Sequence, residues 1–174
     1  AGVRTRITDD LLWLPYVLAE YLEVTGDWSV CGEKTCYLES PPLREGERER
    51  YETPRCSERE DTVYRHALAA IRCAMERGAG SHGLALIGGG DWNDGMNRVG
   101  AAGRGESVWL TWFLTIVLQD FAPLCQRSGE EELAQELLAQ GEKYLAAAQA
   151  AWDGNWYRRG YFDSGAPLGT RGAE

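Results

Sequence analysis

The chain has 174 residues, enough for one domain or for a piece of a larger one. Hydrophobic residues make up 44% and charged residues 26%, an ordinary balance for a globular protein that excludes a wholly disordered chain. The net charge of −9 argues against a nucleic acid as partner, because such proteins need clustered Lys and Arg. The longest apolar stretch, 108–118, is too short to cross a bilayer and no signal peptide opens the sequence, so we expect no membrane contact from this segment.

Periodic apolar residues predict four helices joined by long loops. The first covers 9–24, with Thr8 as N-cap, two first-turn aspartates and Gly26 as its end. Pro15 is expected to kink this helix or to delay its regular start. The segment 27–56 contains adjacent prolines and a run of charges, which is typical of a long exposed connection.

The second predicted helix begins at Ser57, where Glu60 completes a capping box, and closes at Gly78. The third, 107–125, is apolar on nearly every side, which indicates burial and places its tryptophans in the core. The fourth covers 128–151 and begins at its capping serine.

Two short aromatic segments, 155–157 and 160–162, follow the last helix and are compatible with a small hairpin. Otherwise the sequence predicts an all-α chain of antiparallel helices, arranged as a bundle or as part of an α/α toroid. Because the chain opens and closes abruptly, we expect residues 1–174 to be a fragment of a single larger domain.

Five cysteines without a C-x-x-C pair, together with two histidines, do not favour a metal site. We interpret the cysteines as free thiols in a reducing compartment. His66 is expected to be a core or boundary residue, and His82 is assigned no role. The aromatic content is more informative than the cysteines and histidines, since the chain has seven tryptophans and eight tyrosines but three phenylalanines. Aromatics with a polar edge often line sugar-binding grooves. An aromatic-rich core would give the same composition.

Residues 84–100 form the most unusual segment, in which three consecutive glycines lead into Asp91, Trp92, Asn93 and Asp94. The glycines let the backbone pass close to something bulky or adopt positive φ. No Lys follows them, which argues against a phosphate loop, and the spacing of the oxygens does not fit an EF-hand calcium loop. Two interpretations remain: a turn in which Asp and Asn side chains cap their own backbone, or a carboxylate acid or base beside an aromatic platform, as in glycosidic bond cleavage.

The sequence GGGDWNDGMN at 88–97, followed by GESVWL at 105–110, closely resembles glycoside hydrolase family 94, in particular the phosphorylase-like region of bacterial cyclic β-1,2-glucan synthases. The family also contains cellobiose, cellodextrin and chitobiose phosphorylases. Supporting matches are TDDLLWLPY at 8–16, TGD at 25–27 and WYRRGYFD at 156–163, so that the resemblance covers nearly the whole chain. It implies a portion of an (α/α)6 barrel, a helical toroid with long loops.

The resemblance also implies roles for the loop residues. Asp94 would be the general acid and Trp92 would contact the sugar, while Asp91 and Asn93 would bind hydroxyls or shape the loop. The implied reaction is inverting phosphorolysis of a β-1,2-glucan, which releases α-glucose 1-phosphate. Inorganic phosphate would be the co-substrate, and no cofactor or metal is expected. Asp94 would have to be protonated near neutral pH, which desolvation and the neighbouring Asp91 charge would favour.

No clamp of Arg and His for phosphate is visible in the chain, and Arg98 and Arg104 are expected to be solvated surface residues. By the resemblance, a longer parent protein would be anchored in the bacterial inner membrane, with this segment in the cytoplasm.

Two other functions remain open. An inverting hydrolase on the same scaffold would need a second carboxylate about 6.5–9.5 Å from Asp94, for which Asp163 is the candidate. A non-catalytic carbohydrate-binding helical module would use the aromatics only as a platform.

Overall fold

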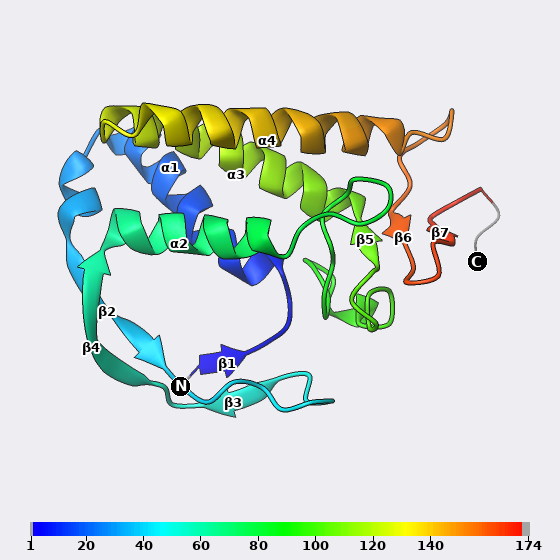
Figure 1. Ribbon diagram of the computed structural model, residues 1–174, viewed down its shortest axis with the longest axis horizontal. Coiled ribbons are helices and arrows are strands. Elements are labelled where there is room, and N and C mark those ends of the chain that lie inside the picture. Colours follow the sequence, from blue (N-terminus) through cyan, green and yellow to red (C-terminus); the bar gives the residue numbers. More distant parts are fainter. Residues whose placement is uncertain (1, 172–174) are drawn as a thin grey trace.

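The structure is a computed structural model that describes residues 2–171. Four helices form its body: α1 (Trp13–Thr25), α2 (Val63–Glu76), α3 (Val108–Arg127) and α4 (Glu131–Ala150) (Figure 1). α3 and α4 form the most extensive packed pair, and α1 packs on both α2 and α3. The chain is therefore mainly helical, as predicted, although short strands accompany the helices. The (α/α)6 barrel and the assignment of 1–174 to one larger domain stay predictions.

The start of the first helix shows how Pro15 is accommodated. A 3-10 turn, Asp9–Leu11, comes first, and α1 becomes regular only at Trp13, so Pro15 lies in its first turn, where its missing N–H costs no intrahelical bond. The helix is thus delayed. Thr8 makes no capping bond, because its Oγ1 donates to the carbonyls of Leu86 and Ile87 instead.

At the other end of α1, Gly26 adopts φ 67° and its N–H bonds to the Leu22 carbonyl at 2.9 Å, which confirms the predicted stop.

The predicted start of the second helix is wrong. Residues 57–62 belong to strand β4 (Arg55–Thr62), which pairs antiparallel with β2 (Lys34–Glu39). The helix begins after Thr62, whose side chain accepts the Arg65 N–H at 3.2 Å. Pairing with a distant segment has overridden the local capping box, and Glu60 lies opposite Cys36 in the ladder.

The segment 27–56 is largely exposed, as predicted, but it is not a structureless connection. It holds a 3-10 turn, Trp28–Gly32, and β3 (Arg50–Glu52), which pairs with β1 (Gly2–Arg4). Figure 1 shows β2 and β4 leaving the helices as a ribbon that leads to β1 and β3. We call residues 34–62 the β-arm.

The cysteine prediction is wrong for one pair. A disulfide joins Cys36 to Cys56 across the β-arm, where the register between β2 and β4 shifts between Cys36 and Leu38 and their Cα atoms lie 5.6 Å apart. Cys31, Cys73 and Cys125 are free.

The third helix is the centre of the core, as its apolar sequence predicted. Ser107 caps it by accepting the Leu110 N–H at 3.0 Å. Twelve side chains of α3 are buried, among them Phe113 and Phe121. By length and composition alone α3 could span a membrane, but 67% of that stretch is buried inside the fold, as in the core helix of a globular protein.

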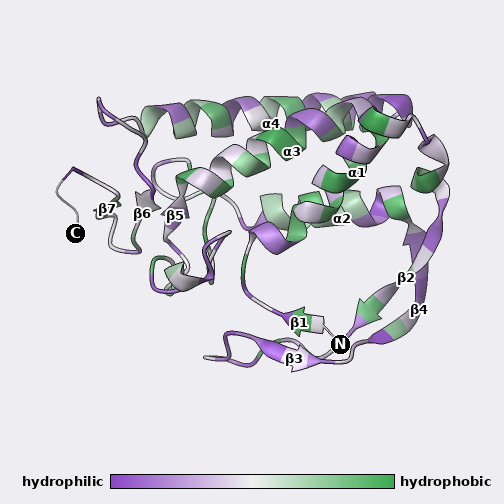
Figure 2. Ribbon diagram, turned by 180° about the vertical axis from the view of Figure 1, so that it is seen from behind, coloured by the Kyte–Doolittle hydropathy of each residue, from purple (hydrophilic) through white to green (hydrophobic). Residues whose placement is uncertain are grey.

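The fourth helix begins at Glu131 rather than at Ser128, which instead ends α3 with its N–H bonded to the Leu124 and Cys125 carbonyls. Figure 2 shows hydrophilic and hydrophobic residues alternating along α4, as expected for a helix with one face on the core.

A three-stranded sheet follows, built from β5 (Glu106–Ser107), β6 (Gly160–Tyr161) and β7 (Pro167–Leu168). The segment 160–162 thus begins a hairpin, but its partner is 167–168 rather than 155–157, which makes a separate bridge between Tyr157 and Trp152.

Candidate active site

We call residues 88–97, which lie between α2 and α3, the acid loop. Its glycines allow close contact with the N-terminal segment. Gly88 has φ 62°, and a Cβ there would lie 2.6 Å from the Arg6 carbonyl oxygen. The Gly89 N–H bonds to the same carbonyl at 3.0 Å, and the Thr8 N–H reaches the Gly90 carbonyl at 3.4 Å. The bulky neighbour expected from the glycines is therefore the chain's own residues 6–8.

Asp91 anchors the loop from inside. Its side chain is fully buried, and both carboxylate oxygens accept hydrogen bonds from Arg159 Nη2, at 2.6 and 2.8 Å. Ser107 Oγ donates to Oδ2 at 2.5 Å, and the Asn93 N–H donates to Oδ1 at 3.1 Å. Of the two roles expected for Asp91, this geometry favours shaping the loop.

Asn93 also acts on the backbone. It caps the 3-10 turn Asp94–Met96, and its Oδ1 accepts the Gly95 N–H at 3.0 Å. Its side chain is exposed, so the amide N–H₂ remains available to a ligand.

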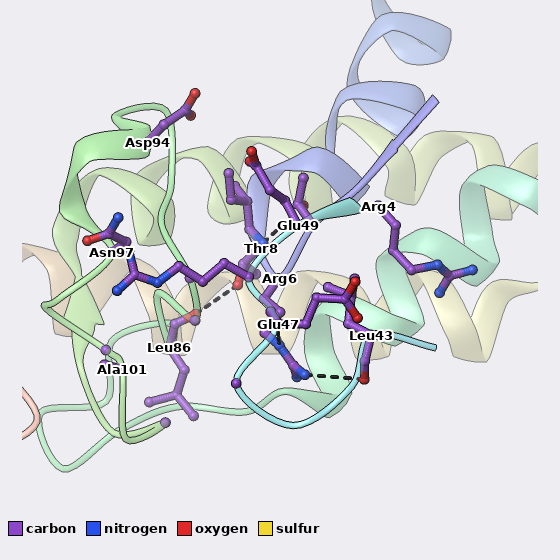
Figure 3. A pocket seen from close by; sticks show the side chains of 18 of the residues that line it. Arg4, Arg6, Thr8, Leu43, Glu47, Glu49, Leu86, Asp94, Asn97 and Ala101 are labelled. Carbon is purple, nitrogen blue, oxygen red and sulfur yellow. Dashed lines mark hydrogen bonds between the residues drawn. The ribbon is translucent and has the colours of Figure 1, made fainter. Parts of the chain in front are cut away.

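Asp94 differs from Asp91 both in its exposure and in its hydrogen bonding. It is exposed, and its carboxylate accepts no hydrogen bond from any described residue. It lies on the edge of a pocket of about 1050 Å³ between the acid loop, the N-terminal segment and the tip of the β-arm. Figure 3 shows Asp94 at the rim, apart from Arg6 and Glu47.

Trp92 precedes Asp94 by two residues in the acid loop and belongs to an aromatic cluster drawn from three elements. Its side chain is 68% exposed, and its ring centroid lies 6.1 Å from Trp13 of α1 and 6.4 Å from Trp109 of α3. Trp13 in turn packs on Phe113 at 4.7 Å. Trp109, expected in the core, is half-buried and supports this cluster. An exposed indole backed by other rings is suited to stack on a sugar.

The pocket walls are tied together by arginine side chains. Arg6 donates to the carbonyls of Glu47 at 3.0 Å and Arg44 at 2.9 Å, which holds the tip of the β-arm. A longer bond from Arg6 to the Leu43 carbonyl, at 3.4 Å, is drawn in Figure 3. Arg77 donates to Thr8 Oγ1 at 2.6 Å. Arg98 also lines the pocket; it is exposed, as predicted, and donates to no group in the described part of the chain.

Residues 35–174 match the family model of the glycosyl hydrolase 94 superfamily, catalytic domain. The chain belongs to this family.

Similar proteins support this family assignment. The cyclic beta-(1,2)-glucan synthase NdvB of Rhizobium meliloti (strain 1021) is 43% identical over 175 residues, which cover 98% of this chain and 6% of that protein. The 3-O-beta-D-glucopyranosyl-beta-D-glucuronide phosphorylase of Paenibacillus borealis is 44% identical over 111 residues, 63% of this chain and 14% of its own length. Solabiose phosphorylase of the same organism is 33% identical over 165 residues, with shares of 94% and 19%. The chain thus spans less than a fifth of the length of each of these relatives.

Asp9 is a buried carboxyl group of the family 94 chain that its sequence position did not reveal. It lies in the first turn as expected, but its side chain is only 3% exposed. Trp13 Nε1 donates to one carboxylate oxygen at 3.2 Å, and the other has no partner among the described residues. Burial raises the pKa of Asp9 to about 6, aided by the charges of Asp10 and Asp91 and opposed by the Trp13 hydrogen bond.

Asp163, the candidate second carboxylate of a hydrolase, is occupied elsewhere. Its Oδ1 accepts the N–H groups of Arg104 at 2.8 Å and Gly105 at 2.9 Å, and its Oδ2 accepts that of Ala102 at 2.8 Å. The side chain therefore fixes the loop 101–105.

A third buried carboxylate, Glu106 of the GESVWL motif, fixes the segment before the acid loop; no role was assigned to it from the sequence. It is 1% exposed and accepts the N–H groups of His82 at 2.9 Å and Leu84 at 3.2 Å. The His82 ring bonds to it at 2.5 Å through Nδ1 and stacks on Tyr161. The cluster could not be recognised locally, because its members lie 22 or more positions apart in the sequence.

His66, expected at the core boundary, is half-buried on α2. Its Nε2 lies 3.1 Å from the Thr35 carbonyl oxygen, and its ring packs at a tilt of 35° against Tyr37 of the β-arm.

Proposed function

We propose that this chain supplies the general acid of a family 94 catalytic domain that cleaves β-1,2-glucan by inverting phosphorolysis. The observation that carries the proposal is the contrast within the acid loop. Asp91 is buried and fully bonded, whereas Asp94, three residues later, presents an unengaged carboxylate on the same loop as the exposed ring of Trp92. The loop is fixed from inside and leaves one acid facing solvent.

In the proposed reaction Trp92 stacks on a sugar ring and Asp94 donates its proton to the departing glycosidic oxygen. Phosphate attacks the anomeric carbon from the opposite face, the C–O bond breaks, and α-glucose 1-phosphate leaves with inverted configuration. Because phosphate is already an anionic nucleophile, this route needs no second carboxylate to activate water. The engagement of Asp163 with three backbone N–H groups supports this route over hydrolysis.

Keeping Asp94 protonated depends on its surroundings. The Asp91 charge is compensated by Arg159, and Asp94 itself is exposed here. Desolvation of Asp94 would therefore come from the bound sugar and from the rest of a parent domain.

A surface of α1 supports the idea of a larger domain. Leu14, Val17, Tyr21 and Val24 are exposed at helical spacing and form an apolar row along one side of the helix. We expect further helices of the parent domain to cover this row, as in the (α/α)6 barrel implied by the sequence.

The choice of a β-1,2 linkage rests on the glucan synthase relative, and phosphate as co-substrate rests on the phosphorylase relatives. A cytoplasmic location is likewise a proposal that rests on the relative, since the Cys36–Cys56 disulfide removes the argument from free thiols.

The experiment is a phosphate-dependence assay on β-1,2-glucan with the parent protein. We expect α-glucose 1-phosphate only when phosphate is present, and a loss of about 100-fold or more for Asp94→Asn, in line with general acid catalysis. The control is Asp120→Asn, an exposed carboxylate on α3, which should leave the rate unchanged. Sugar release without phosphate would indicate a hydrolase. Equal sugar binding by both proteins without turnover would indicate a carbohydrate-binding module.

A further inference from the structure

We propose that Arg159 and Ser107 are positioning residues for the general acid: they hold Asp94 and Trp92 in place through Asp91 and touch no substrate themselves. This inference rests on the proposed function, because it assigns a role relative to Asp94.

The contact between Arg159 and the acid loop is a closed triangle of hydrogen bonds. Arg159 Nη2 lies within 2.8 Å of both oxygens of Asp91, while Nη1 donates to Ser107 Oγ at 3.0 Å. Ser107 Oγ in turn donates to Asp91 at 2.5 Å. Asp91 is fully buried while the Arg159 side chain is 29% exposed, so loss of the arginine would leave the Asp91 charge buried without its partner.

Both partners of Asp91 are themselves fixed in the fold. The Arg159 N–H bonds to the Leu168 carbonyl at 2.9 Å, and its own carbonyl accepts the Val108 N–H at 3.1 Å. Ser107 lies in β5 and caps α3. The backbone of both residues is therefore fixed where the β5–β6–β7 sheet meets α3.

The loop beyond Asp91 has few other restraints. Trp92, Asn93 and Asp94 are all exposed. The side-chain bonds of this stretch are the Asn93 N–H to Asp91 and the Gly95 N–H to Asn93, both within the loop. Trp92 also packs on Trp13 of α1 and Trp109 of α3, but the side-chain hydrogen bonds that tie this stretch to the sheet and to α3 run through Asp91. A displacement of about 1 Å at a reacting group can cost about 100-fold in rate.

A lysine cannot replace this arginine. The planar guanidinium bonds both carboxylate oxygens and the serine at once, whereas an ammonium group is a point charge without that fork geometry. Arg159→Lys keeps the charge that compensates Asp91 but not the orientation, so it separates positioning from folding.

The test compares two leaving groups in the parent protein, with phosphate present. The natural β-1,2 linkage needs a proton on its departing oxygen, whereas 2,4-dinitrophenyl β-glucoside releases a stable phenolate that needs none. We expect Arg159→Lys to lower kcat on the glucan about 10–100-fold, with KM for phosphate unchanged and the dinitrophenyl substrate turned over at close to the wild-type rate. Asp94→Asn should show the same selectivity, more strongly. Arg72→Gln, an exposed arginine of α2, is the matched control and should change neither rate.

Thermal melting and trypsin cleavage after the exposed Arg98 give readouts independent of activity. We expect Arg159→Lys to unfold near the wild-type temperature but to be cut faster after Arg98, because the loop is loosened. Equal loss on both substrates, or no loss, with Arg159→Lys would overturn this inference while Asp94→Asn keeps its selectivity. If Asp94→Asn shows no selectivity, the proposed function fails instead. Should Arg159→Lys unfold, Arg159→Gln with Asp91→Asn leaves no buried charge and is held to the same criterion.

Discussion

Asp163 and Arg104 hold each other twice: the Asp163 side chain accepts the Arg104 backbone N–H at 2.8 Å, and the Asp163 carbonyl accepts Arg104 Nε at 3.1 Å. With Ala102 and Gly105 also bound to the carboxylate, one residue near the end of the chain closes the loop that follows the acid loop.

Asp163→Asn should therefore destabilise the fold by about 1–3 kcal/mol, because an amide oxygen and N–H₂ cannot accept all three N–H groups. Burial acts to raise the pKa of Asp163, but the three backbone donors outweigh it and lower the pKa. A lowered pKa means that the stabilisation is present above the unfolded pKa and is lost as pH falls through the folded pKa. Urea unfolding from pH 2 to 7 measures both effects. Glu136→Gln, at an exposed carboxylate of α4, is the control, and an equal response of both variants would contradict the role of Asp163.

Trp92→Ala should weaken oligosaccharide binding about 5-fold or more while changing the free energy of unfolding by less than about 1 kcal/mol. The indole is 68% exposed, so its removal leaves little of a cavity, but a sugar would lose its stacking surface. Calorimetric titration with β-1,2-glucan in the parent protein measures the binding. Trp152→Ala removes another exposed tryptophan, at the end of α4, and should leave the affinity unchanged.

Asp9→Asn should remove a pH dependence of stability between about pH 4 and 6. Since burial, with the Asp10 and Asp91 charges, raises the folded pKa of Asp9 to about 6, the folded state holds a proton there that the unfolded chain has already lost. Wild-type stability therefore falls as pH rises across this window, by about 2–3 kcal/mol at most, and is flat with respect to Asp9 above it. The measurement is the difference between wild-type and variant unfolding free energies at each pH. A constant difference would show that Asp9 does not titrate there.

Gly160→Ala should separate β6 from β5. An added Cβ would lie 2.2 Å from the Glu106 carbonyl oxygen, a backbone atom that cannot move aside without breaking the ladder. We expect a loss of more than about 2 kcal/mol, seen as a lower melting temperature. Gly32→Ala is the matched control, because nothing lies within 4 Å of its added Cβ, and it should be neutral or slightly stabilising.

The parts of the fold that could be predicted are those with local signals. α3 follows from its apolar sequence, and the end of α1 follows from Gly26, since neither depends on a distant partner. The predicted start of α2 was wrong because Ser57 and Glu60 match the pattern of a capping box. In the structure these residues form a strand, which is set by pairing with residues 34–39. The disulfide was missed for the same reason, since Cys36 and Cys56 come together only through the pairing of β2 with β4 and the shift of register within it.

The acid loop could be located from its composition, but the different environments of its two aspartates could not be predicted. Asp91 and Asp94 are the same residue type three positions apart, and nothing local says which is buried. The deciding partner, Arg159, lies 68 positions away in the sequence, and the resemblance to the family pointed to Asp94 without explaining Asp91.

The bond from Arg159 to Leu168 also sets a lower limit on how far this part of the domain can be shortened. A deletion series from the carboxyl end that stops before residue 168 would free the Arg159 backbone, and one that stops before 159 would strand Asp91 as an uncompensated anion in the core. Such truncated proteins would keep the complete sequences of all four helices, but Arg159 would no longer fix the acid loop.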